Sequence, residues 1–503
     1  MLERLTRLDG LHVYERSVCE SGGVTYFFAR RGPDKLLGHV APADGRCDGT
    51  CGRSDIEQVG EIDGRPVCLA PRDAANAERI RAALPWTAPR PLGLTTSVGL
   101  GDRLGLATPG HIRAVRETGA GLSPIYAQQS IRELARTGRQ PRDVMDAATW
   151  GVLQEGWRNG YGADADHLQQ PEDIDRTVEA GFTFFTVDPG AHVVDAADGL
   201  DAAALADRYE RLDFAALETT SDDLRNCYAG KTFELAGGDS VELDAMGFLR
   251  AAVKYGTAVA HVARMHRHLA GRMGERPFEL EVSVDETESP TTPAEHYFFA
   301  AELKRLGVAW VSMAPRFVGR FEKGVDYIGD LDAFRESFAR HVAVMRTLGP
   351  YKISIHSGSD KFSIYPVVAE LAGGLVHLKT AGTSYLEAIR AIAGIDPPLF
   401  REIHDFAREN YDADRKTYHV SADMARVPPA AELSDDELAD RLDDFDTRQA
   451  LHVTFGSVLT ADGGQRFRPR IYEALEQQEE QHYAALARHL GRHVAPLART
   501  PAG

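Results

Sequence analysis

Positive charge is scarce in this sequence, which has 57 lysines and arginines against 75 aspartates and glutamates in 503 residues. The formal net charge is therefore -18. Nucleic acids and anionic membrane surfaces select proteins with basic patches, so we expect neither as a partner. A small anionic substrate is compatible with this composition, because a few local lysines and arginines are enough to hold it.

Long apolar runs are also missing, since no stretch approaches the roughly 20 apolar residues that a membrane-spanning helix needs. The first ten residues, MLERLTRLDG, lack the apolar segment of a secretory signal. Together these features predict a cytoplasmic protein that has no membrane partner.

Cysteine is rare, with five residues at Cys19, Cys47, Cys51, Cys68 and Cys227. An odd count without an export signal favours reduced thiols. Cys47 and Cys51 lie close together in RCDGTCGR, but no second pair of cysteines or histidines follows at ligand spacing. We expect a glycine-rich surface turn here and no structural zinc site.

The hydrophobic content of 43% is sufficient for a large core. Strand-like runs broken by Gly, Pro and Asp predict a small α+β domain at residues 1–90. Alternating strands and helices follow at 91–395, interrupted by a long insertion at 191–277, which we expect at an active-site mouth and which ends in a helix. Residues 396–503 are typical of a mostly helical extension.

Eight strand-like segments separated by helices predict a (β/α)8 barrel of the TIM type in the central part. They span residues 93–101, 123–130, 160–168, 182–190, 278–286, 308–317, 351–358 and 375–382. Within the insertion, KTFEL and DSVEL are typical of a small hairpin.

Polar residues alternate with apolar ones in the last two of these strands. Lys352, Ser354 and His356 share one face, and His377 and Lys379 share another. Parallel sheets are covered on both sides, so these polar faces are expected to look into the barrel near its catalytic mouth.

Candidate catalytic residues stand at the carboxyl ends of the strands, where barrel enzymes carry their active sites. They are Asp166 with His167, Asp188, Glu286, His356, and His377 with Lys379. Each histidine taken alone is more often a core or surface residue. Three histidines and a carboxylate meeting at one mouth favour a divalent metal ion, with Zn, Ni, Mn, Fe or Co preferred over Mg or Ca.

Strict alternation leaves two assignments open. It puts Asp166 on one face of its strand with Asp164, and His167 on the other. In the same way Asp285, but not Glu286, shares the parity of the residues before it. Either member of each pair is a candidate metal ligand or acid/base group, because a strand that ends there can turn its next residue toward the site.

Substrate-binding candidates are Gln128, Arg316 and Lys379. Gln128 is suited to bond a hydroxyl group or to cap a loop. Arg316 is suited to hold a carboxylate by a bidentate pair, or to be a solvated surface charge. Lys379, inside the barrel, is suited to polarise an oxygen or to hold a carboxylate.

Several strings, taken in order, resemble the tagaturonate epimerase family of hexuronate catabolism. They are GDRLGLATPGHI, GADADHL, TVDPGAH, SVDETESPTTPAEHY, APRFVGRFEKGVDYIGD, KISIHSGSDKFSIYP and HLKTAGTSYLEA. The resemblance implies a metal-dependent barrel enzyme that interconverts the ketohexuronates tagaturonate and fructuronate at C4. It also implies Asp166 as proton acceptor, Glu286 as proton donor, and His167, His356 and His377 as metal ligands. Apart from the resemblance, a homo-oligomer is compatible with the sequence.

The chemistry of that reaction favours cleavage of the bond between C3 and C4. The hydrogen on C4 is not acidic, because C4 lies one carbon beyond the position next to the C2 ketone, and no nicotinamide fingerprint supports a transient oxidation. A retro-aldol and aldol sequence with two acid/base residues is therefore expected. The alternatives are a metal-dependent aldolase, a ketose isomerase, and a non-catalytic sugar-acid sensor on the same barrel.

Overall fold

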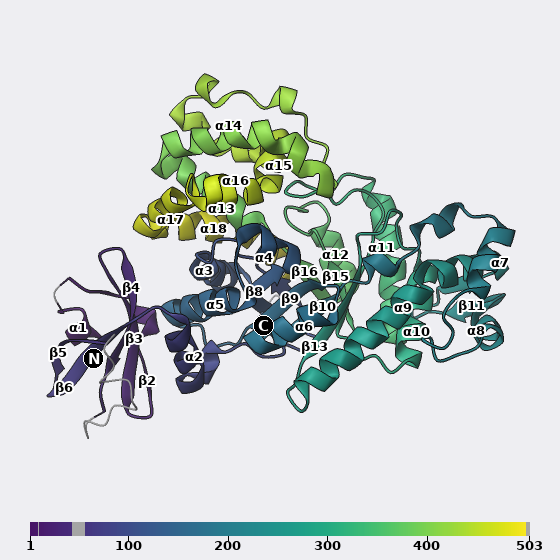
Figure 1. The fold of residues 1–503 in the computed structure, drawn as a ribbon, viewed down its shortest axis with the longest axis horizontal. Coiled ribbons are helices and arrows are strands. Elements are labelled where there is room, and N and C mark those ends of the chain that lie inside the picture. The colour runs from purple at the N-terminus through teal and green to yellow at the C-terminus, as the bar shows by residue number, and fades with distance from the viewer. Residues whose placement is uncertain (9, 43–55, 499–503) are drawn as a thin grey trace.

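The computed structural model describes residues 1–8, 10–42 and 56–498, which form a sheet, a barrel and a helical region (Figure 1). The expected turn at Cys47 and Cys51 lies outside these residues. Within the described chain, no helix is both long and apolar enough to span a membrane.

The N-terminal part is an antiparallel sheet in the order β1-β3-β4-β6-β5, with β2 paired to β3. Its strands are β1 His12–Val13, β2 Cys19–Ser21, β3 Val24–Arg31, β4 Asp34–Val40, β5 Glu57–Ile62 and β6 Arg65–Pro71. Helix α2, Ala74–Ala83, leads toward the barrel and is capped by the side chain of Asp73. Phe28 of the sheet stacks on Trp150 of α5, Pro141–Glu155, which joins the sheet to the barrel.

Eight parallel strands close into a barrel in the order β10-β13-β14-β15-β16-β7-β8-β9, which confirms the predicted (β/α)8 fold. The strands are β7 Ser97–Gly99, β8 Ser123–Ser130, β9 Gly162–Leu168, β10 Phe184–Val187, β13 Glu279–Val284, β14 Ser312–Pro315, β15 Lys352–Ile355 and β16 Val376–Lys379. Each lies within one of the eight segments that the sequence indicates.

Helices between the strands surround the barrel. They are α3 Thr108–Thr118, α4 Ile131–Thr137, α5, α6 Pro171–Ala180, α9 Ala245–Met273, α10 Pro293–Arg305, α11 Leu331–Leu348, α12 Tyr365–Ala372 and α13 Thr383–Ile395. Their starts carry the expected signals: Ser130 and Thr292 each form a capping box with the glutamate three residues later.

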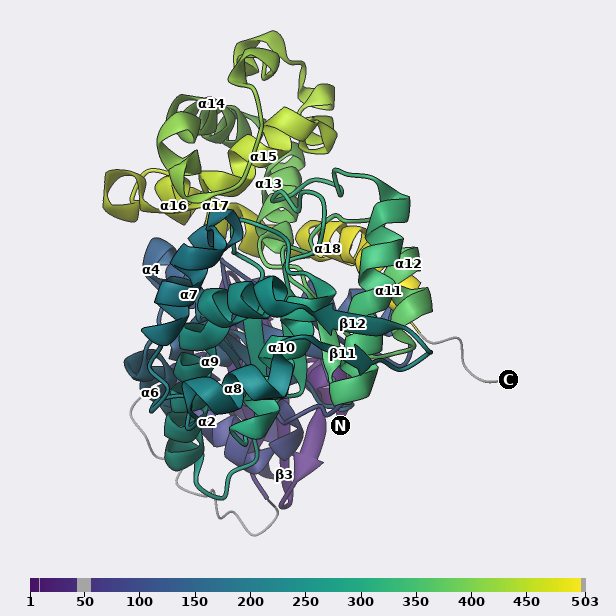
Figure 2. The ribbon, with the colours of Figure 1, turned by 90° about the vertical axis from the view of Figure 1, so that its right-hand side faces the viewer.

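The long insertion folds on the outside of the barrel. Its last helix, α9, packs against α6 and α10 and so serves as the barrel helix between β10 and β13. Helix α7, Ala202–Glu210, lies on α9, and the predicted hairpin forms as β11 Lys231–Glu234 and β12 Ser240–Leu243. Figure 2 shows α7, α8 Ser221–Tyr228 and this hairpin on the same side as α9 and α10.

The C-terminal region is helical, as predicted. It contains α14 Pro397–Asp414, α15 Phe445–Val453, α16 Phe455–Gly464, α17 Arg468–Gln477 and α18 Glu479–Val494. Helix α18 returns to the barrel and packs against α3 and α13. At Gly110 of α3 the two helices approach so closely that a Cβ atom would lie 2.7 Å from the Cβ of Leu486.

This close approach predicts opposite effects for two glycine-to-alanine substitutions. Gly110→Ala should lower the free energy of unfolding by about 1–3 kcal/mol, because the added methyl group overpacks the α3/α18 contact. Gly271→Ala, on the exposed face of α9 with no atom within 4 Å of the new Cβ, should raise it by about 0.5–1 kcal/mol. Urea denaturation measures both. Equal effects of the two variants would contradict the described packing of α18.

Candidate functional site

A cavity of about 430 Å³ opens at the carboxyl ends of the barrel strands. Five of the residues predicted for the site line it, namely Asp166, His167, Glu286, Arg316 and His356. The structure therefore brings together side chains from β9, β13, β14 and β15 or the loops that follow them, as the barrel prediction requires.

Directly beneath the cavity, the ammonium group of Lys379 is surrounded by three carboxylates. Its Nζ lies 2.9 Å from Oδ2 of Asp164, 2.6 Å from Oδ1 of Asp166 and 2.8 Å from Oε1 of Glu281. It also donates a hydrogen bond to Oγ1 of Thr186 at 2.7 Å. All five residues are buried, and a buried charge is tolerated only when it is paired in this way.

The pKa values of this cluster follow from burial and from the excess of acids over bases. Burial alone would lower the pKa of Lys379, but Asp164, Asp166 and Glu281 outweigh it and hold the pKa well above its ordinary value. Burial raises the pKa of Asp164 to about 7, against the opposing charge of Lys379. Burial also opposes ionisation of Asp166, yet Lys379, His167 and His356 keep its pKa below the ordinary value.

Two histidines stand above this cluster with their rings 5.3 Å apart. Nε2 of His356 lies 2.6 Å from Oε1 of Glu281, the same oxygen that contacts Lys379, and Nδ1 lies 3.1 Å from Oδ1 of Asp285. Nδ1 of His167 lies 3.1 Å from Oδ2 of Asp188. Burial opposes protonation of both rings, but Asp285 and Glu281 raise the pKa of His356 to about 9, and Asp166 together with Asp188 raises that of His167 to about 10.

A β-bulge explains how Asp166 and His167, adjacent in sequence, both reach the cavity. The register between β9 and β10 shifts so that Phe185 pairs with Ala165 while Val187 pairs with Leu168. Two residues of β9 therefore lie opposite one of β10. His167 has a positive φ of 53°, which breaks the alternation of the strand and turns its side chain to the mouth.

Asp285 and Glu286 also both line the cavity, because β13 ends at Val284. The Asp285 side chain contacts His356 and is mostly buried. Glu286 is more exposed, and its Oε1 accepts a hydrogen bond from Arg132 at 2.5 Å. Asp285 is thus tied to the metal-ligand candidates, whereas Glu286 faces the open part of the cavity.

Four predicted residues do not line the cavity, and one of them, Asp188, is the partner of His167 described above. Gln128 lies below it and donates a hydrogen bond from Nε2 to Oδ2 of Asp166 at 3.2 Å, which orients that carboxylate. Lys379 lies in the buried cluster. His377 lies one layer deeper, with Nδ1 2.9 Å from Oγ of Ser97 and its ring 5.2 Å from that of Phe184. Burial lowers the pKa of His377 to about 3.

The donor set at the mouth fits a divalent transition metal. One ligand atom each from Asp166, His167 and His356 lies within 4.8 Å of the other two, and the three side chains are nearly or fully buried. Two imidazoles and a carboxylate with open space beside them are typical of a catalytic metal centre. His377 is not in this group, although its Nε2 is buried without a hydrogen-bond partner among the described residues. Its ligand role stays a prediction.

Residues that no sequence pattern indicated roof the cavity. Tyr418, His419, Val420, Ser421 and His452 of the C-terminal region line it from above, together with the loop after β14. Ser421 donates a hydrogen bond to Oε2 of Glu322 in that loop at 2.7 Å. No periodic pattern marks this irregular segment. The described lining includes no residue of the 191–277 insertion.

Comparison with known proteins gives a consistent result. The chain matches the family model described as tagaturonate epimerase over residues 14–497. It is 42% identical, over 96% of both chains, to the tagaturonate/fructuronate epimerase of Thermotoga maritima. It is also similar to the native crystal structure of fructuronate-tagaturonate epimerase from Cohnella laeviribosi, at 37% identity and a TM-score of 0.90, over 99% of this chain and 98% of that one. A glycerol complex of the Cohnella protein gives the same values.

The contacts of Lys379 predict that replacing it destabilises the fold mainly because its three carboxylate partners lose their cation, and less because packing is lost. Lys379→Met should lower the free energy of unfolding by about 3–5 kcal/mol, because three acids lose their cation. The double variant Lys379→Met/Glu281→Gln should be more stable than the single one, because one uncompensated carboxylate is removed. Urea denaturation of the four proteins of this cycle measures the coupling.

Lys352→Met is the matched control for that cycle. Lys352 is equally buried in the barrel, but its Nζ bonds the neutral oxygens of Gly93 and Ser97 and feels the charge of Glu281 without a direct ion pair. Its loss should therefore cost less and should be relieved less by Glu281→Gln. If the free energy of unfolding of Lys379→Met/Glu281→Gln fell by the sum of the decreases in the two single variants, the electrostatic explanation would be contradicted.

Proposed function

We propose that this chain, which belongs to the tagaturonate epimerase family, interconverts tagaturonate and fructuronate by inverting the configuration at C4. The observation that carries the proposal is the extent of the family match. Residues 14–497 include the barrel, whose strand ends supply the candidate acids and histidines, and also the C-terminal segment that roofs the cavity.

The reaction proceeds by breaking and re-forming the bond between C3 and C4. A base removes the proton of the C4 hydroxyl group, the electrons of the C3–C4 bond move toward C3 and the C2 carbonyl, and C4 becomes an aldehyde. The aldehyde rotates and is attacked by C3 on its other face. The new C4 alkoxide then receives a proton, so atoms and electrons balance without an external oxidant.

Asp166 and Glu286 are the proposed proton acceptor and donor. Asp166 is ionised, because Lys379 and the two histidines hold its pKa low. Its carboxylate is therefore in the form that can accept a proton. Glu286 follows a different strand and faces the open cavity beside Arg132. Two acid/base groups from separate strands suit a step in which the aldehyde presents opposite faces, and they exchange roles in the reverse direction.

His167 and His356 would hold the metal ion, with Asp166 beside them. When bound, a divalent cation would supply positive charge where negative charge develops on the C2 and C3 oxygens. Asp188 and Asp285 each contact one of the two rings and fix its orientation. The raised pKa values of both histidines mean that binding a cation would release their protons.

Arg316 is the proposed partner of the substrate carboxylate. It lines the cavity, and its side chain makes no ion pair with another described residue. Neighbouring cations are already engaged: Arg132 pairs with Glu286, Arg103 with Glu133, and Arg320 with Glu322. An unengaged guanidinium suits bidentate recognition of a carboxylate.

Incubation with fructuronate tests this function and its dependence on metal. Chelator-treated protein should give no tagaturonate, and addition of Zn, Ni, Mn, Fe or Co should restore its formation, because the charge on the C2 and C3 oxygens then has a compensating cation. His356→Ala should lower metal affinity and turnover by about 10- to 100-fold or more.

Each other product would point to a different enzyme. Release of a smaller carbonyl compound identifies an aldolase, and exchange with solvent of the hydrogen next to the carbonyl identifies a ketose isomerase. Binding of fructuronate without any turnover in metal-loaded protein would contradict an enzymatic role.

A further inference from the structure

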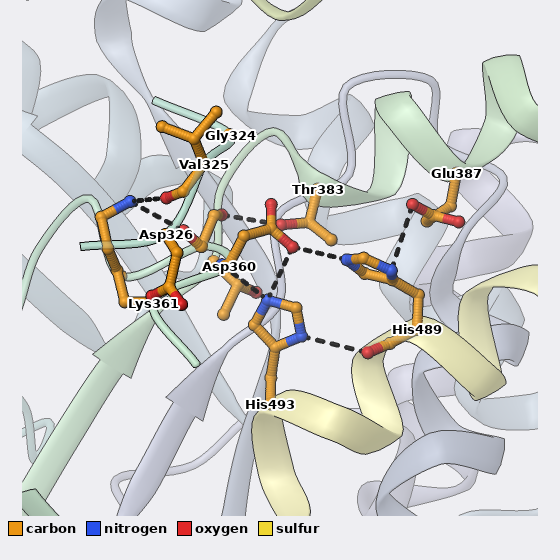
Figure 3. Close-up of polar contacts among 12 residues, drawn as sticks. Gly324, Val325, Asp326, Asp360, Lys361, Thr383, Glu387, His489 and His493 are labelled. Carbon is orange, nitrogen blue, oxygen red and sulfur yellow. Dashed lines mark hydrogen bonds and ion pairs between the residues drawn. The ribbon is translucent and has the colours of Figure 1, made fainter. Parts of the chain in front are cut away.

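A second cluster of buried charged groups lies where the C-terminal region meets the barrel (Figure 3). It centres on Asp360, in the loop between β15 and α12. Its other members come from α13, α15 and α18, and all of them are at least nine-tenths buried: Glu387, Arg448, His489 and His493. None of these five residues lines the cavity.

The core of this cluster joins two carboxylates to Arg448 and His489. Nη2 of Arg448 lies 2.9 Å from Oδ2 of Asp360, and Nε2 of His489 lies 2.6 Å from Oδ1. The same two side chains contact Oε1 of Glu387, Arg448 at 3.4 Å and His489 at 3.3 Å. Figure 3 shows the His489 ring between the two carboxylates. Burial opposes ionisation of Asp360, but Arg448 and His489 hold its pKa well below the ordinary value.

His493 uses both ring nitrogens to hold the backbone. Its Nε2 accepts a hydrogen bond from the backbone N–H of Asp360 at 2.9 Å, and its Nδ1 donates one to the backbone oxygen of His489 at 3.1 Å. The ring is therefore neutral and fully bonded. Although Asp360, His489 and His493 have ligand-type atoms within 4.8 Å of one another, these protein partners make the cluster a structural network and not a cation site.

The loop that this network holds has a strained backbone. Asp360 has a φ of 61° and Ser357 a φ of 49°, a left-handed region that residues other than glycine occupy rarely and at a cost. Such a conformation persists only when surrounding contacts fix it. Here the contacts to the side chain and N–H of Asp360 come from α15 and α18, the far end of the sequence.

This loop is connected to the cavity on both sides of Asp360. Ser357 lines the cavity and accepts a hydrogen bond from Nζ of Lys323 at 2.6 Å. Lys361, next to Asp360, is fully buried and donates to the backbone oxygens of Glu322 and Val325. Glu322 and Lys323 belong to the cavity-lining loop that also carries Arg316.

We propose that Asp360 is a positioning residue: its pairing with Arg448 and His489 fixes the loop after β15 and, through Lys361, the substrate-facing loop after β14. Helices α15 and α18 thereby set the geometry of the cavity, which α15 also lines through His452. The expected effect of Asp360 on turnover of fructuronate rests on the proposed epimerase function. Its expected effect on the conformation of the two loops does not.

Glu387 provides a matched control. It shares Arg448 and His489 with Asp360 and is equally buried, but it lies on α13, and among the described residues its side chain contacts neither cavity loop. Asp360→Asn and Glu387→Gln each remove one negative charge from the same network, so they should lower the urea midpoint of unfolding to a similar extent. Only Asp360→Asn should disturb the loops.

Two measurements on the full-length, metal-loaded protein separate these variants. In Asp360→Asn, kcat/KM for fructuronate should fall about 10- to 100-fold, because small displacements of substrate-binding groups are costly, and hydrogen exchange of peptides covering 320–326 and 357–363 should accelerate at least about tenfold. In Glu387→Gln, kcat/KM should stay within about threefold of wild type and exchange of these peptides should not change.

Equal kinetic losses in the two variants, or wild-type exchange in folded Asp360→Asn, would overturn the positioning role. If Asp360→Asn does not fold, His493→Leu replaces it, since it removes the acceptor of the Asp360 N–H without changing charge, and the same acceleration of exchange is expected. A wild-type protein that does not convert fructuronate would contradict the proposed function, while the exchange comparison would still decide the role of Asp360.

Discussion

The ion pairing of Lys379 with Asp164, Asp166 and Glu281 is the interaction on which the rest of the site depends. Each of these charges would be too costly to bury alone, and their mutual contacts inside the barrel offset that cost. Because Glu281 shares one oxygen between Lys379 and His356, the cluster also fixes a histidine of the mouth. Catalytic geometry and charge balance in the core are therefore coupled.

The C-terminal region completes the site that the barrel begins. Residues 418–421 and His452 roof the cavity, and α18 packs back on α3 and α13. A barrel with only its own loops would leave the mouth open to water, which weakens electrostatic interactions with a charged substrate. This arrangement gives a physical reason for a family match that continues beyond the barrel to residue 497.

Local sequence patterns were enough to predict the eight strands and which of their faces point inward. Lys352, Ser354, His356, His377 and Lys379 are all buried on the predicted inner face. Alternation could not indicate depth, so it placed His377 at the mouth although it lies a layer below, beside Ser97. It also failed at His167, because a bulge and a positive φ are set by the pairing of β9 with β10. The roof and the contacts of Asp360 depend on residues far apart in sequence and carry no local signal.

The central claim is that the charged cluster and the two histidines above it hold one catalytic cation. A crystal structure of the metal-loaded protein, with diffraction data collected at the absorption edge of the added metal, tests it most directly. The account predicts an anomalous peak bonded to His167 and His356 at the floor of the cavity. A peak bonded instead to His489 and His493, or active protein with no peak at the barrel mouth, would contradict it.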